Sequence, residues 1–386
     1  MVKRSNPPTL NLDVQRIGDG AHASLGAAGD TRPQPIIADP GWSPEHTTVG
    51  VARDEHERML IRRLRFRVYI HEQGRRLRGV DWSRAELPDA LDPCSHLWCA
   101  RDGDEIVGTL TQTVIGPTFD LSRLPTVLEL HRFPRMAGRP LGFSSRFVVM
   151  PHYRGTWVLP SLVRRSYAHG RQLGGIFDFM VTNPGLVPFF EALGYVRYTS
   201  TAHHQANGVG LLIPMVLAAT DLEHLQKVRS ACLPAAASFE ADSQWGAWLR
   251  TEHPIMRHYY DDSAEQQLER AAVVAERLRL PRSIALELLK LGFVHHFPAG
   301  AVLRLPGDRV TSGFVALDGD LSLRLGNAAP DLARRIAPDG VPFSRAGVSC
   351  ETDAFVLCVP ARSLVRRARR YPSHAARLHR LMENGI

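Results

Sequence analysis

Apolar positions along residues 47–218 change spacing several times, and the order of spacings predicts a mixed α+β domain. A short strand is expected at residues 47–52. The next segment, from Asp54, has an acidic first turn and then apolar residues at helical spacing, so it is expected to begin as a helix. Two strands should follow, joined by the tight-turn pair Asp102 and Gly103.

The stretch "GFSSRFVVMPHYRGTWVLPSLVRRSYAHG", residues 142–170, predicts a strand, a turn and a helix from about Trp157 to Leu173. The apolar run "GIFDFMVT" then predicts another strand. A strand–helix–strand crossover of this length implies a parallel pair in an otherwise antiparallel sheet. A short helix ending at Gly194 and two further strands, at 195–204 and 208–218, complete the domain.

The rest of the chain divides into three regions of different character. Residues 1–45 are rich in Gly, Pro, Ala and Asp without a sustained apolar period, so we expect a flexible arm before the domain at 46–219. Residues 220–263 read as a helical and aromatic linker. Residues 264–386 combine helices, short strands with turns, and terminal helices interrupted near Pro372, which predicts a second, mostly β domain.

Composition places the chain among soluble globular proteins, with 44% hydrophobic and 22% charged residues. No apolar run is long enough for an integral membrane segment, and the basic N-terminus lacks the apolar stretch of a secretory signal. The five cysteines are odd in number and have no CxxC spacing, so we expect reduced thiols in a cytoplasmic protein. Cys94 and Cys99 have no suitably spaced second Cys/His pair, and no metal site is expected.

The formal net charge of +8 leaves three interpretations open: a solvated Arg-rich surface, an acidic protein partner, or a phosphate-bearing substrate. The sequence has no helix-turn-helix, zinc-finger or aromatic RNA-binding signature. We therefore expect no nucleic-acid partner.

Four ordered segments carry a resemblance to a known family: "LRFRVYIHEQG", "AELPDALDP", "IVGTLTQTVIG" and "SSRFVV". Together they are similar to the acyl-homoserine lactone synthase and long-chain N-acyl amino acid synthase branch of the GNAT acyltransferase superfamily. The resemblance implies a sheet in which two parallel strands diverge and expose backbone groups to the pantetheine arm of an acyl donor. The donor's phosphate would lie at the turn and helix N-terminus that follow.

The resemblance also implies a site. It assigns a catalytic group of Glu86, Asp89, Asp92 and Arg146, a substrate-binding group of Arg65, Tyr69 and Ser145, and a carrier-binding group of Phe147, Val148, Val149, Arg154 and Gly155. A strand N–H near Phe147 or Val148 would stabilise the oxyanion, and Arg146 would pair with a carboxylate. The co-substrate would be acyl-CoA or an acylated acyl carrier protein, whose acidic surface suits a basic chain, and the acceptor a small amine.

Two positions depart from the family pattern. Phe143 stands where the lactone synthases have a Glu, and Phe190 stands where many GNAT enzymes have a Tyr, so the general base is unassigned. Asp89 and Asp92 could instead lie in a solvated loop, Arg146 could form a structural ion pair, and Tyr69 could simply pack in the core. The alternative function is a catalytically inactive GNAT-like ligand sensor or protein-interaction module.

The second domain resembles the cyclic-nucleotide-binding β-roll in the order of its turn residues, Gly300, Pro306, Gly307, Asp308 and Gly319. Family members that bind nucleotide use a Gly-Glu pair and an Arg. Here no Glu follows Gly340 before Phe343, and only Arg345 remains. The resemblance implies a degenerate regulatory or assembly domain without bound cyclic nucleotide. We expect the aromatic segment at 245–260 to cover it, joining two domains or the two chains of a homodimer.

Overall fold

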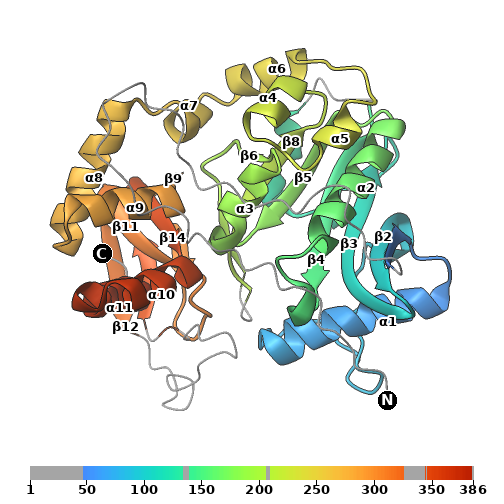
Figure 1. The fold of residues 1–386 in the computed structure, drawn as a ribbon, viewed down its shortest axis with the longest axis horizontal. Helices are drawn as coiled ribbons and strands as arrows, with labels where there is room; N and C mark the ends of the chain where they lie inside the picture. Colours follow the sequence, from blue (N-terminus) through green and yellow to red (C-terminus); the bar gives the residue numbers. More distant parts are fainter. Residues whose placement is uncertain (1–46, 134–138, 206–208, 326–343, 345, 385–386) are drawn as a thin grey trace, which may run out of the picture.

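The computed structural model describes residues 47–133, 139–205, 209–325, 344 and 346–384. The predicted arm at 1–45 and the loop residues Gly340, Phe343 and Arg345 lie outside these ranges. Within them the chain is a mixed sheet flanked by helices, followed by a smaller helix-and-strand unit (Figure 1). The predicted α+β class is confirmed at this level.

The first sheet has the order β1-β2-β3-β4-β5-β8-β6, with β7 beside β8. The predicted hairpin between β2 and β3 is confirmed, and Gly103 in its turn has a φ of 58°. β4 and β5 form the expected parallel pair, whereas the other described neighbours in this sheet are antiparallel. The strands are β1 (Thr47–Val51), β2 (Ser95–Asp102), β3 (Glu105–Ile115), β4 (Leu141–Val149), β5 (Phe177–Thr182), β6 (Val196–Arg197), β7 (His203–Gln205) and β8 (Gly210–Ala218).

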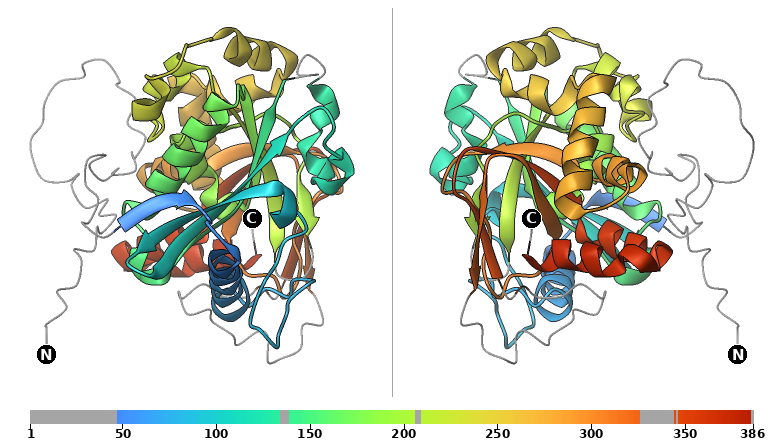
Figure 2. Two further views of the ribbon diagram at one scale, coloured as in Figure 1. Left: turned by 90° about the vertical axis from the view of Figure 1, so that its right-hand side faces the viewer. Right: turned by 90° about the vertical axis from the view of Figure 1, so that its left-hand side faces the viewer.

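Helices cover both faces of this sheet (Figure 2). Helix α1 (Glu55–Phe66) continues into one π-helical turn, η1 (Arg67–Glu72), and begins at Asp54, whose side chain accepts from Glu57 N. Helix α2 (Val158–Gln172) lies on the opposite face, so close that a Cβ on Gly108 would lie 2.5 Å from Val158 Cγ1. The short helix α3 (Val187–Ala192) follows β5 as predicted.

The segment between the domains packs against the first sheet. Its helices are α4 (Leu222–Lys227), α5 (Leu233–Ala236), α6 (Gln244–Glu252) and α7 (Ile255–Tyr260). Helices α4 and α5 are separate, and Arg229 between them adopts a φ of 52°, which an α-helix does not accommodate. Trp248 of α6 packs with Phe133 and Phe177, so these helices complete a core of the first domain rather than forming a free linker.

The C-terminal unit contains two three-stranded antiparallel sheets, in the orders β10-β13-β12 and β11-β14-β9. Helices α8 (Ala264–Leu278) and α9 (Arg282–Leu291) precede the strands. The terminal helices α10 (Ala361–Arg370) and α11 (Ala375–Asn384) are separated at Pro372, as predicted. The strands are β9 (Phe293–Phe297), β10 (Val302–Arg304), β11 (Ser312–Asp318), β12 (Leu321–Leu325), β13 (Ala346–Cys350) and β14 (Ala354–Pro360).

The two units share buried contacts. Arg197 of β6 is 2% exposed; it pairs with Glu191 at 2.8 Å and donates to the carbonyl of Val294 in β9. Its guanidinium also lies 4.6 Å from the ring centroid of Tyr259 in α7, and His295 stacks on that ring at 4.9 Å. The aromatic segment therefore joins the two units of one chain. In the described residues, no helix is long and apolar enough to cross a membrane.

Candidate functional site

The first feature of the site is the separation of β4 from β5. The strands pair only at Gly142 with Asp178 and at Phe143 with Phe179. The register of β4 against β3 then shifts, and Arg146 within the shift has a φ of 53°, which identifies a β-bulge. A non-glycine residue held in this conformation is typical of functional positions. Beyond the bulge the two parallel strands diverge, as the sequence resemblance implies.

The bulge leaves one edge of β4 facing the gap. Val148 pairs with Thr109 of β3, and Met150 N donates to Val107 O at 2.9 Å, so these residues direct their backbone groups toward β3. Because direction alternates along a strand, Phe147 and Val149 direct theirs toward β5. Among the predicted carrier-binding residues, Val148 already pairs its backbone with β3, whereas Phe147 and Val149 supply the gap-facing groups.

Two side chains occupy the carbonyls on this edge. Tyr69 of η1 donates its hydroxyl to Phe147 O at 3.3 Å, and Arg154 donates Nε to Val149 O at 3.1 Å. Tyr69 thus combines a buried ring with a hydroxyl at the gap, and core packing is only part of its role. Phe190, where many family members have a Tyr, packs edge-on against Phe147 at 5.2 Å between ring centroids.

An ion-pair network adjoins the bulge and brings together four of the predicted residues. Arg146 Nε donates to Asp89 Oδ2 at 2.5 Å, and Asp89 N donates to Asp92 Oδ2 at 2.9 Å. Arg65 donates Nη1 to both carboxylate oxygens of Asp92 at 2.9 Å. Its Nη2 donates to Thr111 of β3 at 2.7 Å. The acidic loop is thereby fixed against α1 and the sheet.

Asp89 and Asp92 have different partners and surroundings. Asp92 is 7% exposed and bonded to the fully buried Arg65, so the solvated-loop alternative is wrong for Asp92. Burial alone would raise the pKa of Asp89. The neighbouring Arg146 guanidinium, the Leu91 N–H and Arg65 outweigh burial, so that the pKa of Asp89 lies below its usual value. An ionised Asp89 positions Arg146, whose side chain remains 30% exposed.

The remaining predicted residues lie around this network. Glu86 is not brought to it, because its carboxylate pairs with Arg62 of α1 at 2.7 Å. Ser145 lies opposite Thr111, one residue before the bulge. Arg154 forms a two-pronged ion pair with Glu72, at 2.6 and 2.5 Å, so it would have to exchange this carboxylate to bind a phosphate.

The turn after β4 has the geometry expected of an anion site. Gly155 has a φ of 73°, and Trp157, the N-cap residue of α2, supplies no side-chain cap, although Val158 N donates to Thr156 Oγ1 at 3.5 Å. Uncapped N–H groups at a helix start attract anions. The predicted position for a donor phosphate is consistent with this geometry.

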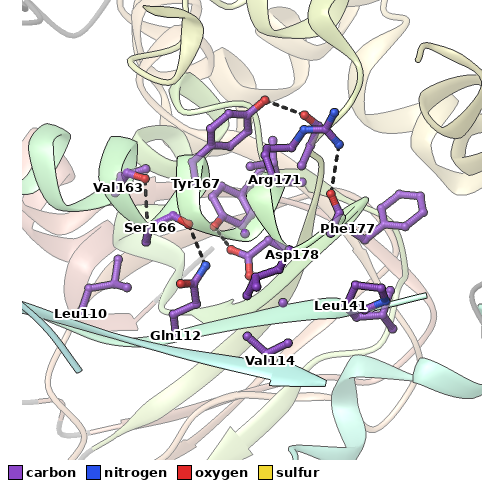
Figure 3. A pocket seen from close by; sticks show the side chains of 18 of the residues that line it. Leu110, Gln112, Val114, Leu141, Val163, Ser166, Tyr167, Arg171, Phe177 and Asp178 are labelled. Carbon is purple, nitrogen blue, oxygen red and sulfur yellow. Dashed lines mark hydrogen bonds between the residues drawn. The ribbon is translucent and has the colours of Figure 1, made fainter. Parts of the chain in front are cut away.

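A narrow pocket lies under α2, between β3, β4 and β5 (Figure 3). Its lining is mainly apolar and includes Leu110, Phe147, Val163 and Leu217, so it is suited to an aliphatic chain. The lining also has polar residues, among them the acidic Asp178, whose Oδ2 accepts from the Tyr195 hydroxyl while Oδ1 has no hydrogen-bond partner. Asp178 and Tyr195 were not identified from the sequence; the signal was one acidic residue in the apolar run "GIFDFMVT".

The carboxyl group of Asp178 gives a testable pH dependence. Burial raises its pKa to about 6, although hydrogen bonds from Tyr195 and Ser144 oppose the shift. Between pH 4 and pH 6 the folded chain thus retains a proton that the unfolded chain releases, so stability falls as pH rises. Asp178→Asn should remove this loss, on the order of 3 kcal/mol at pH 7. Urea unfolding of wild type and Asp178→Asn from pH 4 to pH 7 measures this loss of stability. A difference in unfolding free energy that does not change with pH would contradict the raised pKa of Asp178.

A further residue near the gap was also missed. The guanidinium carbon of Arg75 lies 4.6 Å from the centroid of the Tyr69 ring. Its Nη2 donates to Asn183 Oδ1, at the end of β5, at 3.3 Å. Arg75 and Asn183 thus connect the segment after η1 to the residue that follows β5, across the mouth of the gap.

Comparison with known proteins gives matches to solved structures only. No protein-family model and no curated protein matches the chain. The chain is similar to FeeM, an N-acyl amino acid synthase from uncultured soil microbes, with 18% identity, 50% of this chain and 98% of that chain covered, and a TM-score of 0.38.

Two lactone synthases give similar values. The match to the acyl-homoserine lactone synthase LasI has 16% identity, covers 46% of this chain and 91% of that chain, and has a TM-score of 0.34. The match to the CoA-dependent acyl-homoserine lactone synthase BjaI has 14% identity, covers 50% of this chain and 98% of that chain, and has a TM-score of 0.37. Each of these matches covers half of this chain or less.

Proposed function

We propose that the protein is an N-acyltransferase that moves a medium or long fatty acyl group from a pantetheine thioester to an amino-acid-like amine. The observation that carries this proposal is the gap between β4 and β5. There a bulge at Arg146 leaves the backbone edge at Phe147 and Val149 facing away from β3, beside an ordered Arg–Asp network. An edge of this kind pairs with an extended, amide-bearing ligand by strand addition.

The pantetheine arm would lie in the gap with its amides paired to Phe147 and Val149. The thioester carbonyl would then meet an N–H just beyond the bulge, which stabilises the oxyanion of the tetrahedral intermediate. The acyl chain would enter the apolar pocket under α2. The arm would displace Tyr69 and Arg154 from the two carbonyls they now occupy.

The transfer itself needs few groups. The amine nitrogen forms a bond to the carbonyl carbon, the carbon–sulfur bond breaks, and the proton lost by the nitrogen is delivered to the departing thiolate. The Tyr69 hydroxyl lies on the gap-facing edge of β4, and we assign it the delivery of that proton. Arg146 lies on the Tyr69 side of the gap, 5.9 Å from the ring centroid, where it would orient the acceptor.

For the acyl donor we propose acylated acyl carrier protein, with acyl-CoA as the alternative. We place the reaction in the cytoplasm. An acidic carrier complements a chain of net charge +8, and such complementarity weakens as salt rises. For the C-terminal unit we propose a cyclic-nucleotide-binding-like roll that binds no cyclic nucleotide. Two short sheets between paired helices are consistent with such a roll.

The test is a panel of acyl thioesters from C2 to C18, on CoA and on acyl carrier protein, each mixed with a set of amines. We expect an amide product, detected by mass, with the longer donors, and higher activity with the carrier protein at low salt. Thioester binding without any amide across the panel would contradict the proposal and favour the sensor alternative.

A further inference from the structure

The loop that follows η1, residues 74–85, exposes charges of one sign. Its exposed charged residues are Arg76, Arg78 and Arg84, and its one acidic residue is half-buried. Residues 62–86, which contain this loop, hold eight arginines and three acidic residues, a net charge of +5 in a chain whose total is +8. Much of the positive charge of the chain is thus concentrated in one short segment.

Trp82 lies at the tip of a closed turn in this loop. Asp81 and Glu86 exchange two backbone hydrogen bonds, at 2.9 and 3.0 Å, and the Asp81 side chain accepts Arg84 N at 3.0 Å. The Trp82 ring meets Phe66 edge-on, with 5.5 Å between the ring centroids, and yet the residue is 69% exposed. No large apolar side chain in the described part of the chain is more exposed. The turn therefore presents an indole to solvent in a fixed position.

The three exposed arginines of the loop are weakly paired. Leu77 and Val80 are partly buried against the core, which leaves Arg76 and Arg78 on the outer side of the loop. Among the residues that the structure describes, neither Arg76 nor Arg78 forms an ion pair. Arg84 approaches a carboxylate only to 3.9 Å, and its side chain is 73% exposed. The loop thus holds cations that an anionic surface can reach.

A single exposed apolar side chain is ordinary on a protein surface. An exposed indole among weakly paired cations is a narrower combination, and it matches the two components of an anionic lipid surface. Tryptophan favours the headgroup region of a bilayer, where the ring leaves water and its N–H stays hydrated. Guanidinium groups bind phosphates through paired hydrogen bonds, and each basic residue near an anionic leaflet adds attraction.

An acidic protein would suit the arginines equally well. However, a protein interface surrounds its anchoring Trp with further contacts that exclude water. The other exposed residues of the loop are arginines and small residues, which do not supply an apolar surround for Trp82. The loop therefore favours lipid over protein as its partner.

We infer that the loop docks the protein on the surface of an anionic lipid bilayer, with Trp82 in the headgroup region and the three exposed arginines on lipid phosphates. The loop also lies beside the gap, since Arg75 within it donates to Asn183 at the mouth. The docking rests on the loop alone. Its use, which is to release a long-chain amide directly into lipid, rests on the proposed acyl transfer.

The experiment measures co-sedimentation of the full chain with vesicles of phosphatidylcholine, either alone or with about 30% phosphatidylglycerol to supply anionic headgroups. The test variants are Trp82→Ala, Trp82→Tyr and the triple variant Arg76→Gln, Arg78→Gln, Arg84→Gln. The matched controls are Leu268→Ala, at a residue of α8 that is 59% exposed, and the triple variant Arg257→Gln, Arg277→Gln, Arg282→Gln, which removes the same charge from exposed positions elsewhere.

Wild type should bind the anionic vesicles and not the neutral ones, and binding should weaken as salt rises. Trp82→Ala should lower the partition coefficient about tenfold, because an apolar ring is no longer buried in the interface. The triple variant of the loop should lower it about 100-fold, which is roughly fivefold for each charge. Trp82→Tyr keeps an interfacial ring and should retain most of the binding. Both controls should bind much more like wild type.

Failure of wild type to bind anionic vesicles would overturn the inference. Equal losses in the loop and control triple variants would also overturn it, since overall charge would then explain the attraction. If the loop variants instead lose use of an acidic carrier-protein donor while vesicles are not bound, the partner is a protein and the inference fails.

Acyl transfer from a soluble thioester, measured without vesicles, is the independent readout. It should be unchanged in the loop variants, and similar melting temperatures should show that they fold like wild type. If wild type forms no amide, the proposed function fails, but the vesicle measurement still decides the docking.

Discussion

Replacing Asp92 with alanine is expected to lower the free energy of unfolding by about 3–5 kcal/mol. The partner, Arg65, is fully buried and directs both bonds of Nη1 to this carboxylate. Without it, Arg65 retains only the bond from Nη2 to Thr111, and a buried guanidinium is left uncompensated. Denaturant unfolding measures the loss. Any fall in activity of Asp92→Ala alone would therefore not identify a catalytic role.

The double variant Arg65→Met, Asp92→Leu separates charge from packing. A buried ion pair replaced by apolar residues of similar volume often costs little, whereas removing one partner costs much. We expect the double variant to be more stable than either Asp92→Ala or Arg65→Met alone. If Asp92→Ala stays within about 1 kcal/mol of wild type, the pair does not hold the acidic loop as the geometry indicates.

Replacing Arg146 with glycine is expected to reduce kcat/KM about 10- to 100-fold, the equivalent of one charge-assisted interaction. The position has a φ of 53°, so glycine relieves the backbone while removing the guanidinium. The bulge should persist, and the melting temperature should change little. Steady-state kinetics with a long-chain donor measure the effect.

Two companion variants distinguish side chain from backbone at this position. Arg146→Lys keeps a charge near Asp89 but not the planar fork, and should recover part of the activity. Arg146→Val keeps neither, and its branched side chain disfavours a positive φ, so it should lose both activity and stability. Wild-type kinetics in Arg146→Gly would remove Arg146 from the site and leave it as a structural ion pair.

Local patterns predicted the elements that position the site. The turn pair at Asp102 and Gly103 and the crossover from β4 through α2 to β5 follow from spacing and short-range chemistry, and both are confirmed. The assembly of Arg65, Asp89, Asp92 and Arg146 was predicted in outline, because segments with family spacing imply proximity. The exact partners were not predicted, because the sequence could not show that Glu86 pairs with Arg62 and lies apart from this network.

Contacts between distant segments account for what sequence reasoning missed. Asp178 meets Tyr195 only after the chain passes through α3, and His204 meets Asp308 only when the two units dock. The side chain of His204 is enclosed in this contact, at 7% exposed.

The most direct test of the gap between β4 and β5 as the donor site is residue-level hydrogen exchange along β4. The measurement compares the chain alone with the chain bound to a non-hydrolysable acyl-pantetheine thioether. We predict slower exchange at the amides of Phe147 and Val149, which face the gap, and no change at Val148, whose backbone pairs with Thr109 in both states. Unchanged exchange at Phe147 and Val149 under saturating ligand would contradict the proposal that this edge holds the acyl donor.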